Sequence, residues 1–421
     1  MDNRNKVLRI IIGADIAPVK SNYDLFSKGD AKTLVGDELL EKLSLADFTV
    51  FNLETPLTDK SAPIMKCGPN LIAPENTIKG LKAVNPHFFT LANNHIFDQG
   101  MQGLYSTIKL LDRAGIAHAG AGKDAGEASK PYIFEKNGHK IGIYCCAEHE
   151  FSIANENSPG ANPYDPLASF DDVQVLKGTC EFVIVLYHGG KECYRYPSPE
   201  LQRVFRKFAE KGADIVIAQH THCIGCMEKY NHSYLIYGQG NFLFPAEHNE
   251  YWDSSVLIEL TISGDKKLGV QYHPLVVCKN RIRLAEGKQK ASILADFAKR
   301  SEEIQKKNFI QDHYISYIQT QGHDYAKVVK GENRILKRLF LKCFRRSFSF
   351  HYGRKRLLAL LNFIECECHR EIVIAEIKRC MTDVHGTGQG GGMKRWTTTK
   401  SFSFVFSIVL ILAALQPFTT G

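Results

Sequence analysis

EFVIVLYHGGKE (Glu181–Glu192) opens a series of three stretches that decides the fold; the other two are KGADIVIAQHTHC (Lys211–Cys223) and YLIYGQGNFLF (Tyr234–Phe244). Each is an apolar, β-branched run that stops at polar or glycine residues. This pattern is typical of a buried strand that presents side chains beyond its C-terminal end. The first run leads to His188 and Glu192, and the second leads to His220 and His222. Neutral imidazoles bind zinc, iron, nickel and manganese-class ions, so the three histidines indicate a metal site.

The composition is that of a globular protein with one unusual basic segment. The chain has 421 residues, 44% of them hydrophobic and 23% charged, which is enough to bury a large core. Its net charge of +8 is uneven, because eleven Lys and Arg residues lie between Lys327 and Arg356 against a single acid, Glu332. The remainder of the chain is close to neutral.

The cysteines and the N-terminus favour a cytoplasmic catalytic domain. Twelve cysteines are scattered along the chain, which is unlike the disulfide framework of a small secreted domain. The N-terminus enters a strand pattern at once and lacks an apolar stretch long enough for a secretory signal. We therefore expect reduced thiols.

Three earlier strands also end at polar side chains. Val7–Ile12 leads to Asp15, Phe48–Leu53 leads to Glu54, and Phe88–Leu91 leads to an Asn-His pair. Carboxylates in these places are candidate metal ligands, although each could simply cap a loop. The pair is Asn94 and His95, followed by Asp98. The amide oxygen of the asparagine can bind a hard metal, and the histidine, oriented by the aspartate, could protonate a leaving group; the alternative is a hairpin or helix-cap role.

The order of elements predicts an α/β fold. Strands alternate with helices early in the chain, and later strands pair as hairpins, one of them across Asn137-Gly138. This order indicates layered mixed β-sheets flanked by helices. The segment Glu148–Asp172 is rich in Asn, Pro and Ser and is expected to form a loop over the site.

The pattern becomes helical after the strands. Ile293–Lys307 and Ile310–Val329 have helical spacing, and Arg334–Arg346 combines an apolar stripe with a basic face. That basic helix could lie on an anionic membrane surface or dock on the protein with a solvated face. A further helix is expected over Leu357–Cys380. It contains Cys366, Cys368 and His369, for which we favour ordinary packing over metal binding because alternate positions on a helix diverge.

The last residues have a different character. After the glycine-rich run Thr387–Gly392 comes Met393, then a basic start, an apolar run from Phe402 to Leu415 and a polar end. One interpretation is a C-terminal membrane anchor, although the apolar run is short for a span. The other is a signal-like peptide of a second protein, fused through a lost stop codon.

Taken together, the motifs resemble the CapA family of capsule and poly-γ-glutamate biosynthesis proteins, which is related to calcineurin-like metallophosphoesterases. The resemblance runs from Val7 to Val277. The matching pieces are Gly13-Ala14-Asp15, NLETPLT from Asn52, LANNHIFDQG from Leu91, HGGKE from His188, GADIVIAQHTH ending at His222, and YGQGNFLF from Tyr237.

The resemblance implies a role for each matched residue. The implied metal ligands are Asp15, Glu54, Asn94, His188, His220 and His222. The implied catalytic pair is His95, the acid, with Asp98. Glu192 and Asn241 also match motif positions, and we expect them to bind substrate. The implied cofactors are one or two divalent ions of manganese, iron or zinc.

Three departures bear on these roles. Gln219 replaces the usual glycine before His220, and Ala14 is inserted before Asp15. Ala17 stands where phosphoesterases carry a histidine ligand. A further feature, Cys223-x-x-Cys226, could supply a soft ligand or a redox pair, with ordinary buried thiols as the alternative.

We therefore predict a metallophosphatase-like domain over residues 7–280, a helical basic extension over 291–382 and a hydrophobic segment over 393–421. The expected function is metal-dependent hydrolysis of a phosphoester or amide in the synthesis of an anionic exopolymer. The alternative is a polymer-binding or assembly subunit with a degraded metal site. Expected partners are an anionic polymer, the exopolymer synthesis machinery and a membrane surface contacted by residues 327–356. Nucleic acid is not expected as a partner.

Overall fold

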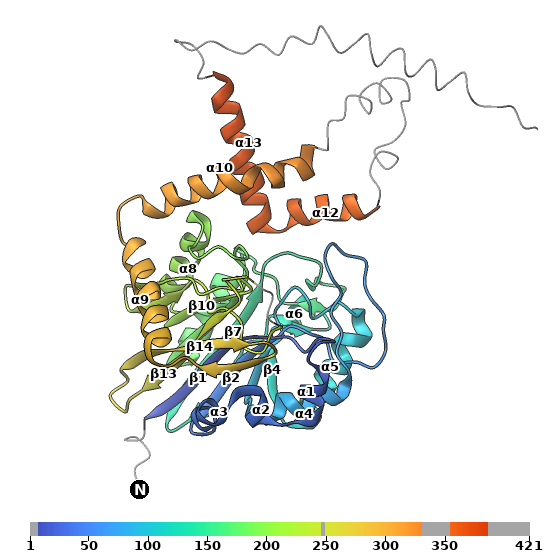
Figure 1. Cartoon of the computed structure of the whole chain (residues 1–421), viewed down its shortest axis with the longest axis vertical. Coiled ribbons are helices and arrows are strands. Elements are labelled where there is room, and N and C mark those ends of the chain that lie inside the picture. Colours follow the sequence, from blue (N-terminus) through green and yellow to red (C-terminus); the bar gives the residue numbers. More distant parts are fainter. Residues whose placement is uncertain (1–6, 246–248, 331–353, 386–421) are drawn as a thin grey trace, which may run out of the picture. The chain divides into compact units, whose positions relative to one another are not determined.

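The computed structural model describes residues 7–245, 249–330 and 354–385 (Figure 1). Contacts within the chain divide it into two units, Met1–Glu376 and Ile377–Gly421. All elements discussed below lie in the first unit, except the C-terminal part of the last helix, α13 (Glu367–His385). Among the described helices, none is both long enough and apolar enough to span a bilayer. The hydrophobic segment 393–421 and most of the basic segment lie outside the described residues.

The first sheet has seven strands in the order β15-β14-β13-β1-β2-β3-β4. The strands β1 to β4 run parallel, whereas β13, β14 and β15 are joined antiparallel at one edge. Their bounds are β1 Leu8–Ile16, β2 Phe48–Leu53, β3 Phe88–Thr90, β4 Ala117–Ala119, β13 Ser254–Ile262, β14 Leu268–Cys278 and β15 Arg281–Leu284.

The second sheet has six strands in the order β11-β12-β10-β9-β7-β6. Four central strands are parallel, and an antiparallel strand closes each edge. The predicted hairpin across Asn137-Gly138 is confirmed, and both residues have the positive φ that a tight turn needs. The bounds are β6 Tyr132–Lys136, β7 His139–Ala147, β9 Phe182–His188, β10 Ile215–Gln219, β11 Met227–Tyr230 and β12 Ser233–Ile236; β5 (Ala121–Gly122) and β8 (Gly160–Ala161) form a separate small pair.

Helices cover the outer faces of the two sheets, so the predicted layered α/β fold is confirmed. The sheets pack face to face through an apolar core that includes Ile12, Val50 and Ile184. A second core, with Phe26 and Leu104, lies between the first sheet and its helices, and a third, with Phe205, lies outside the second sheet. Strands buried on both faces explain why the sequence shows continuous apolar runs rather than alternation.

The helices of the layered domain are short. They are α1 Tyr23–Lys28, α2 Ala31–Val35, α3 Asp37–Ser44, η2 Glu75–Thr77, α4 Ile78–Ala83, α5 Gly100–Ala114, α6 Ala125–Ala128, α7 Ser169–Thr179 and α8 Pro199–Glu210.

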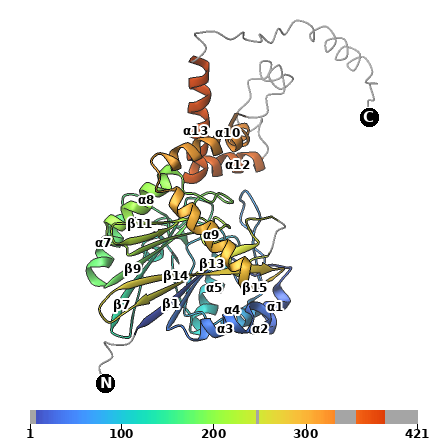
Figure 2. The same ribbon diagram turned by 60° about the vertical axis from the view of Figure 1, so that its left-hand side comes forward.

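The helical extension follows β15. It comprises α9 Gly287–Glu303, α10 Phe309–Lys330, α12 Arg354–Glu365 and α13 Glu367–His385. Helix α9 contacts β11 and β14, one strand from each sheet, and runs beside them in Figure 2. The single helix expected over Leu357–Cys380 is wrong, because it breaks at Cys366 into α12 and α13.

Candidate metal centre

A β-bulge in β1 aims Asp15 at the site. Strand β1 pairs with β2 as far as Ile12 and Val50, and pairing resumes at Asp15 and Asn52, so β1 has one extra residue in this interval. An extra residue reverses the alternation of side chains along a strand. Asp15 therefore lies on the face of Ile12, which points toward the second sheet.

The bulge explains two sequence departures. The inserted Ala14 lies within the bulge. Two glutamines from other segments of the chain, Gln219 and Gln239, donate to main-chain carbonyls of the bulged part of β1. Gln219 Nε2 lies 3.3 Å from the oxygen of Gly13, and Gln239 Nε2 lies 3.1 Å from that of Ile12. A buried carbonyl without a partner is costly, so the replacement of glycine by Gln219 satisfies a group that the bulge leaves unpaired.

The first group of candidate ligands is Asp15, Glu54 and His188. Their nearest ligand atoms lie within 4.8 Å of one another, and all three side chains are buried. The amide nitrogen of Asn52 sits among them, 2.9 Å from Asp15 Oδ1, 3.4 Å from Glu54 Oε1 and 3.2 Å from His188 Nδ1. This asparagine begins the motif NLETPLT, but the motif did not predict a role for it.

The carboxylate of Glu54 is poorly satisfied by protein groups. Its Oε2 is buried and makes no hydrogen bond. Burial, together with the adjacent charge of Asp15, raises the pKa of Glu54 well above its ordinary value. A divalent cation would relieve both penalties, so the donor set fits a metal.

The second group is Glu192, His220 and His222, whose ligand atoms also lie within 4.8 Å of one another. Both histidines are buried and have φ angles of 86° and 51°, in the left-handed region that non-glycine residues rarely adopt. Such conformations cost about 1–3 kcal/mol and persist where the surroundings hold them. Asn241 Oδ1 lies 2.7 Å from His222 Nδ1, where it orients the ring as metal-site partners do.

Asn94 connects the histidines to the loop after β7. His188 Nε2 lies 3.1 Å from Asn94 Oδ1, and Asn94 Nδ2 donates to Glu150 Oε2 at 3.3 Å. Ser152 Oγ donates to the carbonyl of Asn94 at 2.7 Å. The segment predicted as a loop, Glu148 to Asp172, thus contacts the site with its first residues, but it also contains β8 and the first residues of α7. Glu150 is a neighbour that the sequence did not reveal.

His95, which is partly buried, and the fully buried Asp98 form a pair beside this centre. His95 Nδ1 lies 2.7 Å from Asp98 Oδ2, and the main-chain nitrogen of Leu71 donates to the same oxygen at 2.6 Å. The ammonium of Lys66 forms a short ion pair with the other oxygen, and its side chain is only 3% exposed. No sequence pattern singled out Lys66, because it lies in a loop without periodicity.

The electrostatics favour neutral imidazoles. Burial, followed by the charges of His220 and His222, lowers the pKa of His188 well below its usual range. Burial also lowers the pKa of His220. Metal binding needs a deprotonated ring nitrogen, so the folded chain holds these rings in the form that coordinates.

Two sequence features add no ligand. Ala17 is fully buried, and its N–H donates to the carbonyl of Leu243 at 3.0 Å. Burial raises the pKa of Cys223 to about 12 and that of Cys226 well above its ordinary value. Both thiols are therefore protonated, which favours the interpretation as ordinary buried cysteines.

The structure brings the predicted site residues into one neighbourhood at the C-terminal ends of the parallel strands. Glu192 and Asn241, which were expected to bind substrate, both lie against the paired histidines. Glu192 is grouped with His220 and His222, and Asn241 contacts His222. That expected role stays a prediction.

Comparison with known proteins identifies the family of this chain. The model of the bacterial capsule synthesis protein PGA_cap matches residues 10–246, which is more than half of the chain. The chain belongs to this family. It is 28% identical over 216 residues to the PGA biosynthesis protein CapA of Bacillus subtilis, covering 50% of this chain and 57% of the relative. The capsule biosynthesis protein CapA of Bacillus anthracis is 27% identical over 224 residues, covering 51% and 54%.

The predicted resemblance to CapA proteins is therefore confirmed, and the matched regions span little more than half of these Bacillus relatives. A solved structure titled a putative 5′-nucleotidase from Staphylococcus aureus aligns with a TM-score of 0.40 at 13% identity, covering 70% of this chain and 58% of that one.

Proposed function

We propose that this PGA_cap-family protein is a metal-dependent hydrolase of capsule or poly-γ-glutamate synthesis that acts on a phosphoester or amide. The observation that carries the proposal is the convergence of Asp15, Glu54, His188, His220 and His222 beside the pair His95–Asp98. The names of the Bacillus relatives support the polymer context.

The two ligand groups suit one or two divalent ions of manganese, iron or zinc. Ions bound there would polarise a phosphoryl or carbonyl oxygen and lower the pKa of a bound water. In this scheme Asn241 holds the ring of His222, and Asn94 adds an amide oxygen beside His188. Asp98 holds His95 through Nδ1, and His95 donates a proton to the departing oxygen or nitrogen.

Lys66 gives the proton donor a fixed environment. It neutralises Asp98 in a buried setting, and its ammonium lies 3.2 Å from His95 Nδ1. A carboxylate held in this way keeps the imidazole in one orientation, which is what a positioned general acid requires.

A second candidate function is a polymer-binding or assembly subunit. Ala17 removes one ligand of the expected set, and the amide nitrogen of Asn52 lies among the first three ligands. Both features favour a weakened centre. In either case the proposed partners are an anionic polymer and its synthesis machinery. A cytoplasmic location for this domain, with membrane contact through the C-terminal residues, also remains a proposal.

The first experiment is metal analysis of the purified full chain by plasma mass spectrometry after loading with manganese, iron or zinc. We expect His220→Ala/His222→Ala to lose at least one ion per chain, whereas His232→Ala, on the exposed turn between β11 and β12, keeps the wild-type content. Loaded protein should hydrolyse model phosphodiesters or γ-glutamyl amides, and His95→Gln should lower the rate about 100-fold or more.

The result has three distinguishable outcomes. Metal with hydrolysis supports the enzyme. Metal without hydrolysis of either substrate class favours the binding subunit. A folded chain that takes up no metal at this centre, when ions are supplied, contradicts the hydrolase.

A further inference from the structure

A third group of potential metal ligands lies beside the candidate metal centre. It differs from the first two groups because it contains a cysteine and includes residues of the helical extension. One ligand atom each from Glu150, Cys366 and His369 lies within 4.8 Å of the others. Glu150 belongs to the loop after β7, whereas Cys366 and His369 lie at the junction of α12 and α13. Glu150 is therefore more than two hundred positions away in the sequence from the other two residues.

Two members of the cluster lie at the start of α13, directly after the break at Cys366. The main-chain nitrogen of Cys366 donates to the carbonyl of Asn362, and its own carbonyl accepts from Arg370, so Cys366 is where one helix ends and the next begins. Cys366 and His369 are three residues apart at the first turn of α13, a spacing that puts both side chains on one face. The expectation of ordinary packing rested on alternate positions, which diverge on a helix, and it does not apply to Cys366 and His369, which are at i and i+3.

Contacts with the layered domain fix the first turn of α13. Glu367 accepts a hydrogen bond from the main-chain nitrogen of His149 at 3.0 Å and pairs with its ring at 2.5 Å. The thiol of Cys366 lies 3.7 Å from Glu148 Oε2. Both partners immediately precede Glu150, so the same short segment anchors the helix and supplies the third member of the cluster.

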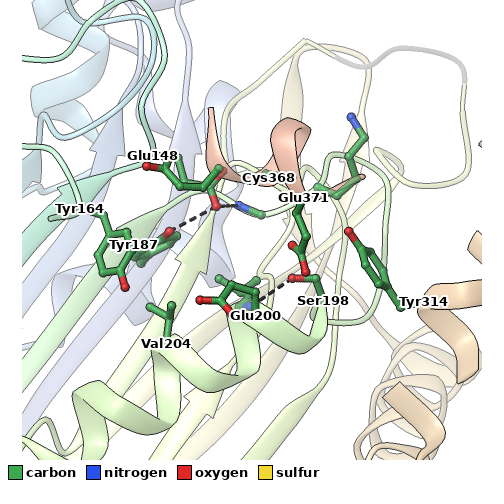
Figure 3. Close-up of a pocket in the computed structure, with 13 residues that line it drawn as sticks. Glu148, Tyr164, Tyr187, Ser198, Glu200, Val204, Tyr314, Cys368 and Glu371 are labelled. Atoms are coloured by element: carbon green, nitrogen blue, oxygen red, sulfur yellow. Dashed lines mark hydrogen bonds between the residues drawn. The ribbon is translucent and has the colours of Figure 1, made fainter. Parts of the chain in front are cut away.

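Cys368 points elsewhere and provides a built-in comparison. It lines a cavity of about 60 Å³ together with Glu148, Tyr187, Tyr314 and Glu371 (Figure 3). It is buried like Cys366 but is outside the ligand cluster.

Asn362, whose side chain contacts the ring of His369, supports a role for this histidine as a metal ligand. Asn362 Nδ2 lies 3.1 Å from His369 Nδ1, while Asn362 Oδ1 is buried and makes no hydrogen bond. Rotating the amide would aim Oδ1 at the ring and let it accept an Nδ1–H, which is how asparagine and carbonyl groups orient metal-bound histidines. The rotation would satisfy the orphaned oxygen and select Nε2 for coordination.

We propose that Glu150, Cys366 and His369 bind one zinc-class divalent cation. An imidazole, a thiolate and a carboxylate form a borderline ligand set that suits zinc or cobalt better than magnesium or calcium. Ligands of one zinc ion lie roughly 3.5 Å apart, so the cluster needs only a small contraction. Binding replaces the thiol proton, which leaves to solvent, and three protein ligands leave a fourth coordination position open.

This site is separate from both groups of the main centre but adjoins them. Glu150 Oε2 accepts from Asn94, which in turn contacts His188. The extension would then contribute ligands next to the main centre, and an ion there would hold the first turn of α13 in place. The inference does not depend on the proposed hydrolase function.

Cobalt substitution tests the proposal, because among the ligand clusters found in the described part of the chain this one alone contains a thiol. The chelator-treated full chain is titrated with Co²⁺ and the near-ultraviolet thiolate-to-cobalt absorption is recorded. We expect the band in the wild type, in His220→Ala/His222→Ala and in Cys368→Ser, and its loss in Cys366→Ser. Glu150→Gln and His369→Ala should weaken Co²⁺ binding about 10-fold or more. One equivalent of Zn²⁺ should abolish the band.

Two results would overturn the proposal: no thiolate band in the folded wild type at saturating Co²⁺, or an undiminished band in Cys366→Ser. Circular dichroism verifies that each variant is folded, and Glu150→Gln, in a loop, keeps the test open if a helix variant does not fold. Loss of metal from the main centre with the band retained would contradict the hydrolase and leave this site standing.

Discussion

At the scale of single residues, the site is defined by groups that are buried and held in uncommon states. Glu54 has an oxygen without a partner, His188 and His220 are held neutral, and Lys66 is an almost fully buried ammonium. Burial amplifies electrostatic interactions, so each of these groups costs stability unless a neighbour or a ligand compensates it. Such groups are expected where binding or chemistry takes place.

The first prediction concerns Glu148 and pH. Burial, followed by the charge of Glu367, raises the pKa of Glu148 from 4.5 to about 8. The folded chain therefore keeps a proton that the unfolded chain loses, and the stability from this group is fully present below pH 4.5 and is lost as the pH rises through 8. A shift of this size corresponds to a fall in the free energy of unfolding on the order of 5 kcal/mol.

Urea unfolding of the metal-free chain at several pH values measures this fall. Glu148→Gln stays neutral and can still accept from Tyr187 and the nitrogen of Gly190, so we expect its stability to change much less between pH 5 and pH 8. Glu156→Gln, exposed in the same loop, should follow the wild type. Parallel pH profiles for all three proteins would show that Glu148 titrates normally.

At the scale of elements, the irregular segment of β1 is what allows a strand to deliver Asp15. The bulge interrupts the main-chain hydrogen bonds between strands. The side-chain amides of Gln219, in the second sheet, and Gln239, in the segment before β13, bond to carbonyls that the bulge leaves without a partner. Gln239 has the larger role, because its Nε2 also lies 3.3 Å from the carbonyl of Val256. This one side chain therefore ties β1 to β13 where their ladder ends.

The second prediction follows from this bridge. Gln239→Ala leaves the buried carbonyls of Ile12 and Val256 without this donor, and we expect a loss of about 1–3 kcal/mol in the free energy of unfolding. Gln174→Ala, on the exposed face of α7, should change stability by about 0.5 kcal/mol or less. Equal effects in urea unfolding would show that the bulge does not need the amide. Metal affinity should also fall in Gln239→Ala, since the bulge positions Asp15.

At the scale of the whole molecule, the basic charge and the catalytic candidates are separated along the chain. The layered domain carries the site, whereas the run of eleven cationic residues from Lys327 to Arg356 follows it. An anionic surface attracts each Lys or Arg near it by about 1 kcal/mol, so this run has enough charge to bind acidic lipid or polymer.

The third prediction tests that surface role. The full chain should co-sediment with vesicles that contain phosphatidylserine and not with neutral phosphatidylcholine vesicles, and added salt should weaken the binding through screening. Replacing Lys337, Arg338, Lys342, Arg345 and Arg346 by glutamine should lower binding strongly without changing metal content. Salt-insensitive binding to both vesicle types would instead indicate the apolar segment 393–421.

The sequence by itself determined the layered α/β fold, the family and most of the site. Buried strands are readable as apolar runs, and parallel strands bring their C-terminal ends to one edge, so the residues that follow each run could be predicted to meet. His188, His220, Glu54 and Asn94 were found in this way, because each directly follows or closely trails a strand.

The tertiary structure alone decided what depends on contacts distant in the sequence. It showed that the inserted Ala14 forms a bulge, that Gln219 satisfies a carbonyl of that bulge, and that Asn52 lies among the ligands. It also placed Lys66 against Asp98, and it brought Glu150 together with Cys366 and His369 of the helical extension. These residues have no periodicity of their own, and their surroundings come from segments far along the chain, so no local pattern records them.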